Sequence, residues 1–468
     1  MKYYPFLLLL IFNLSACHVG NEYTIDYFID DEQVKNELFL DSHSQNISHN
    51  WYDIFDDEDL NTLLNFALKD NFSIKSGIEK LYQSRYTYLI QSKNNFPLLD
   101  GSFTYTFDKT ENSKLKIDNT NLFKVGFDVS WEIDLWGKGE YTSQRYLNLV
   151  KNSQYTLLQL MITITSEVIV NYIGLREAQQ KLYITEKNLQ IQTETLNLIK
   201  NKHSLGLVDD LAISQAQYVV DNTASSIPIL QAQIETYKNT LAVLLGTTLQ
   251  QMPANLDFCK KNIVAKTFKY SVKKLHQLPL SIIRTRPDVL AAEASVKAQN
   301  QAVNEAIADL YPSISLDAAF GYISSSGHSL FNSNNQSYSY QPFVSIPIWR
   351  WGQLSNNILL QKHQREEYVQ NFNNTLITAL TEIKNAIKNI ESSYASNRHK
   401  QSSFNKMQNI LSLTQDKYIN GLIDFTDVAN AEQSLLSSQL ELISNNADIL
   451  RYIVAFYKAT GGGYNFKQ

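Results

Sequence analysis

The stretch Gly206-Leu207-Val208-Asp209 returns later in the chain as Gly421-Leu422-Ile423-Asp424, at an offset in residue number of 421 − 206 = 215. The same offset relates Trp136-Gly137 to Trp351-Gly352. Further pairs at this offset are Pro97 with Pro312, Ser130 with Ser345, Ile133 with Ile348, and Gly246 with Gly461. One constant offset across so long a chain indicates an internal duplication, which predicts that one structural unit is built twice.

The duplication divides the chain of 468 residues into two copies of one unit. Each copy is expected to hold a short helix, two strands, a long helix and a return helix. The predicted boundaries are 1–16 for a signal peptide, 17–70 for a lipidated N-terminal segment, 71–246 for the first copy, 247–285 for a linker, 286–461 for the second copy and 462–468 for a C-terminal tail.

Two segments of each copy alternate apolar and polar residues, which is the period of a half-buried β-strand. In the first copy Phe103, Tyr105 and Phe107 alternate with Thr104 and Thr106. The stretch from Asp108 to Asn121 is too charged for a strand, so we expect a loop there. The predicted strands are about 97–108 and 121–136 in the first copy, and 312–323 and 338–349 in the second. Each is close to the 9–11 residues that a tilted membrane strand needs.

A long helical pattern follows each strand pair, at 137–246 and 352–461. Its apolar residues step by three, four or seven. The return helix of the first copy has a strict heptad at Ile213, Val220, Ile227, Ile234 and Leu241. A seven-residue repeat implies left-handed coiled-coil packing. The first long helix, about 68 residues, would reach roughly 100 Å, and Pro228 is expected to kink the return helix.

The N-terminus has the pattern of an export signal. Lys2 gives a positive start, residues 5–14 form an apolar run too short to span a bilayer, and Leu14-Ser15-Ala16-Cys17 follows. A cysteine after Leu-Ser-Ala resembles the bacterial lipobox. We therefore expect Cys17 to become the N-terminus and to carry a diacylglycerol and an N-acyl chain such as palmitate. The alternative is an ordinary cleavable signal with a chance cysteine. If Cys17 is acylated, Cys259 is a lone thiol.

Composition and motifs give no support to an enzyme or a nucleic-acid-binding protein. The formal net charge of −5 lacks the basic footprint of nucleic-acid binding. The eight histidines have no metal-ligand spacing, and the sequence has neither a phosphate-binding glycine loop nor a nucleophile elbow. The acidic run 53–59 is expected to be a solvated helix start rather than a calcium loop. We expect no catalytic residue, no metal and no cofactor beyond the lipid.

The strands limit how the chain could cross a membrane. No stretch after the signal has 18 consecutive apolar residues, so any spanning part is expected to be a closed β-barrel. Two strand pairs give four strands per chain, whereas the smallest closed membrane barrels have about eight. Several chains must then share one barrel, and a barrel above long helical hairpins would be a pipe.

Several motifs carry a resemblance to a known family. The motif 130–138, Ser-Trp-Glu-Ile-Asp-Leu-Trp-Gly-Lys, resembles the end of the second strand in the NodT-type branch of the TolC-like outer-membrane factor family. Other segments that resemble this family are Arg286-Pro287-Asp288-Val289 through Ala294, Tyr311 to Leu316, Tyr457-Lys458-Ala459 with Gly461-Gly462-Gly463, and Trp51 to Leu60. Together they span nearly all of the mature chain.

The resemblance implies a mainly α fold with a membrane β-barrel, in which a homotrimer forms a 12-stranded barrel over a long α-helical barrel. It also implies an outer-membrane lipoprotein with a periplasmic adaptor and an inner-membrane pump as partners, and no nucleic acid. The expected function is the exit duct of a tripartite efflux pump for small toxic compounds, and hence a part in multidrug resistance. A duct for protein export is an alternative, and so is a structural coiled-coil surface lipoprotein, although the latter leaves the repeated strand pairs unexplained.

Two groups of residues are candidate functional sites. The hairpin tips are expected to dock the adaptor through exposed Leu and Val, with Gly allowing the turn and Asp capping the next helix. The tip residues are Leu205, Gly206, Leu207, Val208, Asp209, Asn420, Gly421, Leu422, Ile423 and Asp424. The resemblance places a periplasmic gate at Thr426, Asn430 and Gln433, where Asn430 replaces the family's carboxylate. Either uncharged hydrogen bonds form the constriction, or a neighbouring acid, Asp427 or Glu432, takes that part.

Overall fold

A computed structural model describes residues 23–24, 51–112, 115–254, 256 and 281–462. The predicted signal peptide, Cys17, most of the linker and all but the first residue of the predicted C-terminal tail lie outside these residues. The chain divides into two compact units. The sheet unit contains Lys80–Gln154 and Ala291–Asn373, and the helical unit contains the described residues within Phe28–Glu79, Tyr155–Leu290 and Asn374–Gln468.

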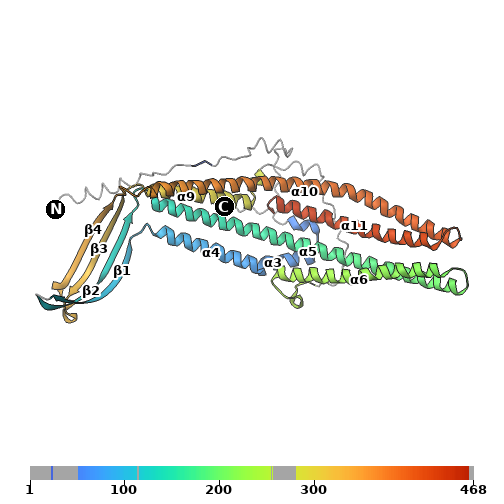
Figure 1. Cartoon of the computed structure of the whole chain (residues 1–468), viewed down its shortest axis with the longest axis horizontal. Helices are drawn as coiled ribbons and strands as arrows, with labels where there is room; N and C mark the ends of the chain where they lie inside the picture. Colours follow the sequence, from blue (N-terminus) through green and yellow to red (C-terminus); the bar gives the residue numbers. More distant parts are fainter. Residues whose placement is uncertain (1–22, 25–50, 113–114, 255, 257–280, 463–468) are drawn as a thin grey trace. The chain divides into compact units, whose positions relative to one another are not determined.

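Four antiparallel strands form one sheet in the order β1-β2-β3-β4 (Figure 1). Their bounds are Leu98–Asn112 for β1, Leu115–Ile133 for β2, Ser313–Ser324 for β3 and Gln336–Ser345 for β4. Each copy of the repeat thus contributes one hairpin, and β2 joins to β3 across the two copies. Within the described chain β1 and β4 are the edges, with one side of each unpaired.

The expected loop between Asp108 and Asn121 is wrong. The strands β1 and β2 continue through most of this stretch, and Asp108 pairs with Thr120 and Thr110 with Asp118. The reason is that a long antiparallel ribbon satisfies its backbone hydrogen bonds within itself, whatever the charge of its side chains. The excess of polar residues therefore marks a polar extension of the hairpin and not its end.

Two long helical hairpins follow the two strand pairs. The first consists of α5 (Lys138–Ser204) and α6 (Asp210–Leu245), and the second of α10 (Gln353–Ile419) and α11 (Phe425–Ala459). The first helix of each hairpin, α5 or α10, has 67 residues, which corresponds to a length of about 100 Å. Helix α6 runs without interruption through Pro228. The remaining elements are η1 (Trp51–Phe55), α3 (Glu58–Asp70), α4 (Phe72–Lys93), η2 (Leu249–Gln251), α8 (Ser281–Arg284), α9 (Pro287–Ala308), η3 (Gly327–Ser329) and η4 (Ser333–Asn335).

Helix α5 is apolar enough, by length and composition alone, to cross a membrane, since an 18-residue window has a mean hydropathy of 1.4. More than half of this window, 56%, is buried inside the chain. Buried residues such as Val168, Ile169 and Leu175 explain its hydropathy as that of a core helix. Polar residues interrupt the window, so the sequence shows no unbroken apolar run there.

The acidic run near the N-terminus starts a helix, as expected. Asp57 is the N-cap of α3 and accepts a hydrogen bond from Leu60 N at 3.1 Å. The second carboxylate oxygen of Asp57 accepts from the Tyr172 hydroxyl at 2.7 Å, and Arg176 approaches Asp59 at 3.5 Å. These contacts attach α3 to α5 within the helical unit.

The duplication is visible in one contact that both copies make. In the first copy Asn71 Nδ2 donates to Leu244 O at 2.7 Å, and in the second Arg286 Nη1 donates to Ala459 O at 2.7 Å. Both donors and both acceptors are related by the offset of the repeat, because 286 − 71 and 459 − 244 are equal to 421 − 206. In each copy a side chain just before the short helix thus holds the end of the return helix.

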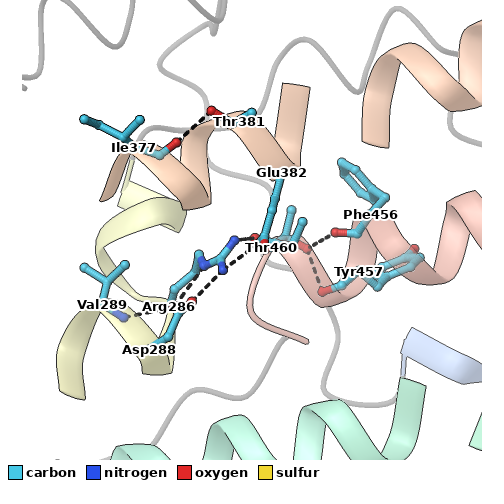
Figure 2. Close-up of polar contacts among 10 residues, drawn as sticks. Arg286, Asp288, Val289, Ile377, Thr381, Glu382, Phe456, Tyr457 and Thr460 are labelled. Carbon is cyan, nitrogen blue, oxygen red and sulfur yellow. Dashed lines mark hydrogen bonds and ion pairs between the residues drawn. The ribbon is translucent and has the colours of Figure 1, made fainter. Parts of the chain in front are cut away.

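The second copy turns this contact into an ion-pair network. Arg286, buried at the start of α9, donates to both carboxylate oxygens of Asp288, at 3.0 and 2.6 Å, and to Glu382 at 2.7 Å (Figure 2). Burial would lower the pKa of Arg286, but the hydrogen bonds and charges of Asp288 and Glu382 raise it above its usual value. The guanidinium therefore stays charged and ties α9, α10 and the end of α11 together.

Candidate functional site: hairpin tips and gate face

Both hairpin turns lie at the same end of the helical unit (Figure 1). Gly206 and Gly421 have φ of +73° and +72°, in the left-handed region that favours glycine. The N–H groups of Leu207 and Leu422, five residues after Lys202 and Lys417, donate to the carbonyls of those lysines at 3.0 Å. This is the hydrogen-bond pattern of a helix that ends in a left-handed glycine, and it explains why both copies have a glycine at the turn.

The two capping aspartates differ. Asp209 accepts a hydrogen bond from Ala212 N at 3.1 Å, as the sequence predicts. Asp424 holds the matching N-cap position with extended backbone, but its side chain makes no capping hydrogen bond. The expectation of a side-chain cap at Asp424 is therefore wrong, because the backbone closes this turn by a 3.2 Å bond from Asp427 N to Asp424 O.

The apolar tip residues also differ in exposure. Leu205, Leu207 and Leu422 are 68–72% exposed, which is rare for leucines that serve only the core. Val208 and Ile423 are half-buried, and Val208 packs on the core of the tip. Val208 is therefore less exposed than expected, because part of its side chain packs on this core, and its role in docking stays a prediction.

A hydrophobic cluster joins the two hairpins next to the turns. We call it the tip cluster; its buried members are Leu196, Ile199, Ala212, Ala216, Val219, Phe425, Val428 and Ala429. The partly buried Val208, Ile213, Val220, Leu411 and Tyr418 pack against it. All four long helices contribute, so the tips are held as one body rather than as two independent hairpins.

Polar contacts surround the tip cluster. Lys202 Nζ lies 4.7 Å from the centre of the Tyr418 ring, and the Thr426 hydroxyl donates to Gln215 Oε1 at 3.1 Å. The first joins α5 to α10 and the second joins α6 to α11. The residues that make both contacts are exposed or partly exposed.

The three predicted gate residues lie on one face of α11. Thr426, Asn430 and Gln433 are exposed and follow each other at helical spacing of four and three. Asp427 is exposed on a neighbouring face, whereas Glu432 is buried. Of the two acids that could replace the family's carboxylate, Glu432 is therefore excluded from the exposed face in this conformation. The gate role of the other residues stays a prediction.

The burial of Glu432 is a feature that sequence reasoning missed. It follows Val428 and Ala429 by four and three residues, so it lies on the side of α11 that carries the tip cluster. One of its carboxylate oxygens is fully buried without a hydrogen-bond partner. Burial raises the pKa of Glu432 to about 7. The only sequence signal is a Glu at a position where the helical period calls for an apolar residue.

Within the described residues, no group of three or more His, Cys, Asp or Glu side chains could hold a metal ion. The tips and the gate face instead offer apolar contact, hydrogen-bonding amides and hydroxyls, and a joint between hairpins. Docking of a partner and constriction of a passage both stay predictions for these residues.

Comparison with known proteins identifies the class. The family model described as "Outer membrane efflux protein" matches residues 63–247 and 278–462, and these two ranges are again related by the offset of the repeat. Because the match covers most of the chain, the protein belongs to this family of outer-membrane efflux channels. The predicted family, location in the outer membrane and role in efflux are thereby confirmed.

Individual relatives support the same class. The solvent efflux pump outer membrane protein SrpC of Pseudomonas putida is 28% identical over 422 residues, which is 89% of this chain and 88% of SrpC. The cation efflux system protein CusC of Escherichia coli K12 is 25% identical over 413 residues, 88% of each chain. The outer-membrane channel OprN has the same fold, with a TM-score of 0.87, 24% identity and coverage of 95% and 99%. The Campylobacter jejuni channel CmeC also has this fold, with a TM-score of 0.87, 24% identity and coverage of 97% and 96%.

Proposed function

We propose that this outer-membrane efflux protein is the exit duct of a tripartite pump, assembled as a homotrimer with a periplasmic adaptor and an inner-membrane pump, and that it catalyses no reaction. The observation that carries the proposal is the sheet with two unpaired edges, β1 and β4. Open edges are not tolerated in lipid, and four strands are too few to close a barrel. Three copies would supply 12 strands and close it.

Exposed aromatic side chains support a membrane setting for the strands. Phe103, Tyr105 and Phe107 of β1 and Tyr340 and Phe343 of β4 are all exposed. In an aqueous setting this much aromatic surface on edge strands would promote aggregation. Against lipid or a neighbouring copy it is stabilising.

The adaptor is proposed to bind the tips through Leu205, Leu207 and Leu422. These leucines are exposed although the tip cluster beside them is well packed, so folding of the chain does not need them there. Apolar residues exposed on a rigid body are the usual anchors of a partner helix or loop. The periplasmic gate is proposed to consist of symmetry copies of Thr426, Asn430 and Gln433. Hydrogen bonds between these uncharged side chains would hold the periplasmic end of the duct closed.

The substrates are proposed to be small toxic compounds. The relatives include pump components named for solvents, toluene, antibiotics and cations. Export in a strain that lacks the gene, with and without the restored copy, tests the proposal. Accumulation of dyes, antibiotics, solvents or metals that falls when the gene is restored would support it. Loss of one secreted protein at normal compound levels would show a duct for protein export instead.

The lipid is proposed to be attached to Cys17, on the strength of the Leu-Ser-Ala that precedes it. Mass spectrometry of the mature protein should find a diacylglycerol and an N-acyl chain on Cys17. The variant Cys17→Ala should lose this mass and keep part of its export, because the barrel itself anchors the protein. An unchanged lipid mass on Cys17→Ala would rule out this site.

A further inference from the structure

A cavity of about 580 Å³ lies within the sheet unit, where the strands meet the helices. Its wall consists of the end of α4, the end of β2 with the start of α5, the end of α9 with the start of β3, and the end of β4 with the start of α10. Binding sites for drug-sized molecules usually have volumes of ~300–1,000 Å³. The cavity is therefore large enough for a small organic molecule, and it is separate from the tips and the gate face.

The cavity lies at the base of a polar face of the sheet. Glu132 on β2 is opposite Ser315 on β3. Ser313 on β3 is opposite Ser345 on β4. Because side chains alternate along a strand, these four residues share one face of the sheet. Three of them, Glu132, Ser313 and Ser345, line the cavity.

The other face of the sheet carries exposed aromatic side chains. Phe127 is opposite Phe320, which is opposite Tyr338, and all three residues are exposed. Each is an odd number of positions from the cavity residue of its own strand, so it points to the other face. A membrane barrel is apolar toward the lipid and polar inside. In the proposed duct the cavity therefore faces the passage.

Glu132 and Tyr311 give the cavity its chemical character. Glu132 is exposed, and among the described residues it has no hydrogen-bond or ion-pair partner. The Tyr311 ring stacks on Trp136 with 5.0 Å between ring centres, but the residue remains 38% exposed, so part of the ring is accessible. A free carboxylate together with an accessible aromatic ring favours an organic cation as the ligand.

The balance of charges in the cavity favours the same class of ligand. Its lining holds the carboxylates Glu132, Asp134, Glu305 and Asp309 and the cations Lys138 and Arg350. Lys138 is neutralised by Asp309 at 2.8 Å. Glu305 is neutralised by Arg145, outside the lining, at 3.3 Å. Glu132 and Asp134 then remain against Arg350, so the cavity keeps an excess of negative charge.

Further carboxylates follow along the polar face, away from the cavity. Asp317 lies in the next row of side chains beyond Glu132. Asp128 and Asp100 lie opposite each other in the row after it, and Lys124 approaches Asp128 at 3.5 Å. Successive rows on one face are about 7 Å apart, because two residues of a strand separate them. A cation that leaves the cavity therefore finds a carboxylate in each of the next two rows.

We propose that this cavity binds aromatic organic cations on their way through the duct. The Glu132 carboxylate pairs with the positive charge of the ligand, and the Tyr311 ring packs against the aromatic part of the ligand. This inference rests on the proposed exit duct and deepens it, because it names a class of substrate and the residues that select it.

Binding of ethidium, an aromatic cation, to the purified full-length protein in a non-ionic detergent tests the site. Fluorescence anisotropy, corrected for detergent alone, should show saturable binding of ethidium and much weaker binding of fluorescein, an aromatic anion of similar size. Glu132→Gln should raise the Kd for ethidium roughly fivefold, the effect of one partly exposed ion pair. The matched control, Glu140→Gln, removes a carboxylate of α5 outside the cavity and should leave this Kd unchanged.

Export from cells separates a failure of the site from a failure of the duct. In a strain that lacks the gene, restored Glu132→Gln should export ethidium more slowly than restored wild type at equal protein levels. Both should export the uncharged compound chloramphenicol equally well. Wild-type protein that binds ethidium no better than fluorescein, or an unchanged Kd in Glu132→Gln, would overturn the cation site. A restored wild-type gene that lowers the accumulation of no compound would instead overturn the proposed duct.

Discussion

At the scale of single residues, Glu432 is the side chain whose environment conflicts most with its chemistry. The residue is 6% exposed on the side of α11 that carries the tip cluster, and one carboxylate oxygen has no hydrogen-bond partner. A carboxylate in such a place costs several kcal/mol, whereas the protonated form costs much less. The stability of the packed tips therefore depends on whether the Glu432 carboxyl is protonated.

We predict that Glu432→Gln stabilises the helical unit at high pH. The pKa of Glu432 rises from 4.5 to about 7 on folding, so the folded chain binds more protons than the unfolded chain between these values. Stability from this group is full below pH 4.5, falls as the pH rises to about 7, and is lost above it. The total is about 3 kcal/mol, from about 1.4 kcal/mol for each pKa unit.

Thermal unfolding at pH 5 and pH 8 measures this effect. The variant Glu432→Gln should be more stable than wild type at pH 8 and should differ little from it at pH 5. Glu441→Gln, on the same helix but exposed, is the matched control and should keep the pH dependence of the wild type. Equal pH dependence of Glu432→Gln and wild type would show that the carboxyl is solvated.

At the scale of elements, each hairpin turn places an exposed leucine directly before a residue that is half-buried. The leucine after the glycine points outward, and the next residue, Val208 or Ile423, is half-buried. Val208 packs on the tip cluster and so belongs to the joint between hairpins. Substitution of the exposed leucine should therefore affect partner binding, whereas substitution of the next residue should affect the packing of the tips.

We predict that Leu422→Asp abolishes export while the protein still assembles, because a charge replaces an exposed apolar anchor. Loss of one such anchor typically weakens a complex by about 2 kcal/mol, or roughly 30-fold. Val208→Asp should instead loosen the tip cluster by about 1–3 kcal/mol. Pull-down of the adaptor and thermal unfolding distinguish the two. Normal adaptor binding and export by Leu422→Asp would refute docking through this leucine.

At the scale of the whole molecule, the gate exists only if several copies meet around one axis. A single chain shows Thr426, Asn430 and Gln433 as one exposed face of α11. Three copies of this face would form rings of uncharged side chains, in contrast to the charged rings that select cations in other channels. The assembly, and not the chain, then sets the selectivity.

We predict that Asn430→Asp makes the channel more selective for cations. Three added carboxylates would form a ring that attracts cations and repels anions. The reversal potential in a planar bilayer under a salt gradient should move toward the cation equilibrium potential by several millivolts or more. Asp427→Asn removes an acid that lies about 60° around the helix from Asn430, outside the line of gate residues, and should have the smaller effect. An unchanged reversal potential in Asn430→Asp would show that this residue lies away from the narrow part of the pore.

Much of this protein could be predicted from local patterns. The constant offset between the copies, the alternation at Phe103 to Phe107 and the heptad from Ile213 follow from the period of apolar residues along the chain, which each element needs for its own geometry. The positions of the tips could be predicted because a helix commonly ends at a glycine in the left-handed conformation. The prediction failed at Asp108 to Asn121, since backbone pairing and not side-chain charge decides where a ribbon ends.

The duplication could be derived from the amino-acid sequence because matching residues recur at one constant offset. The succession of strands and helices along the chain and the positions of both tips could be derived as well, because they depend on residues close together in the chain. Three other features appear only once the chain is folded: Val208 packs against the tip cluster, Glu432 is buried, and Trp136 is half-buried while Trp351 is exposed. Burial depends on which distant elements meet, and equivalent residues of two similar repeats meet different neighbours.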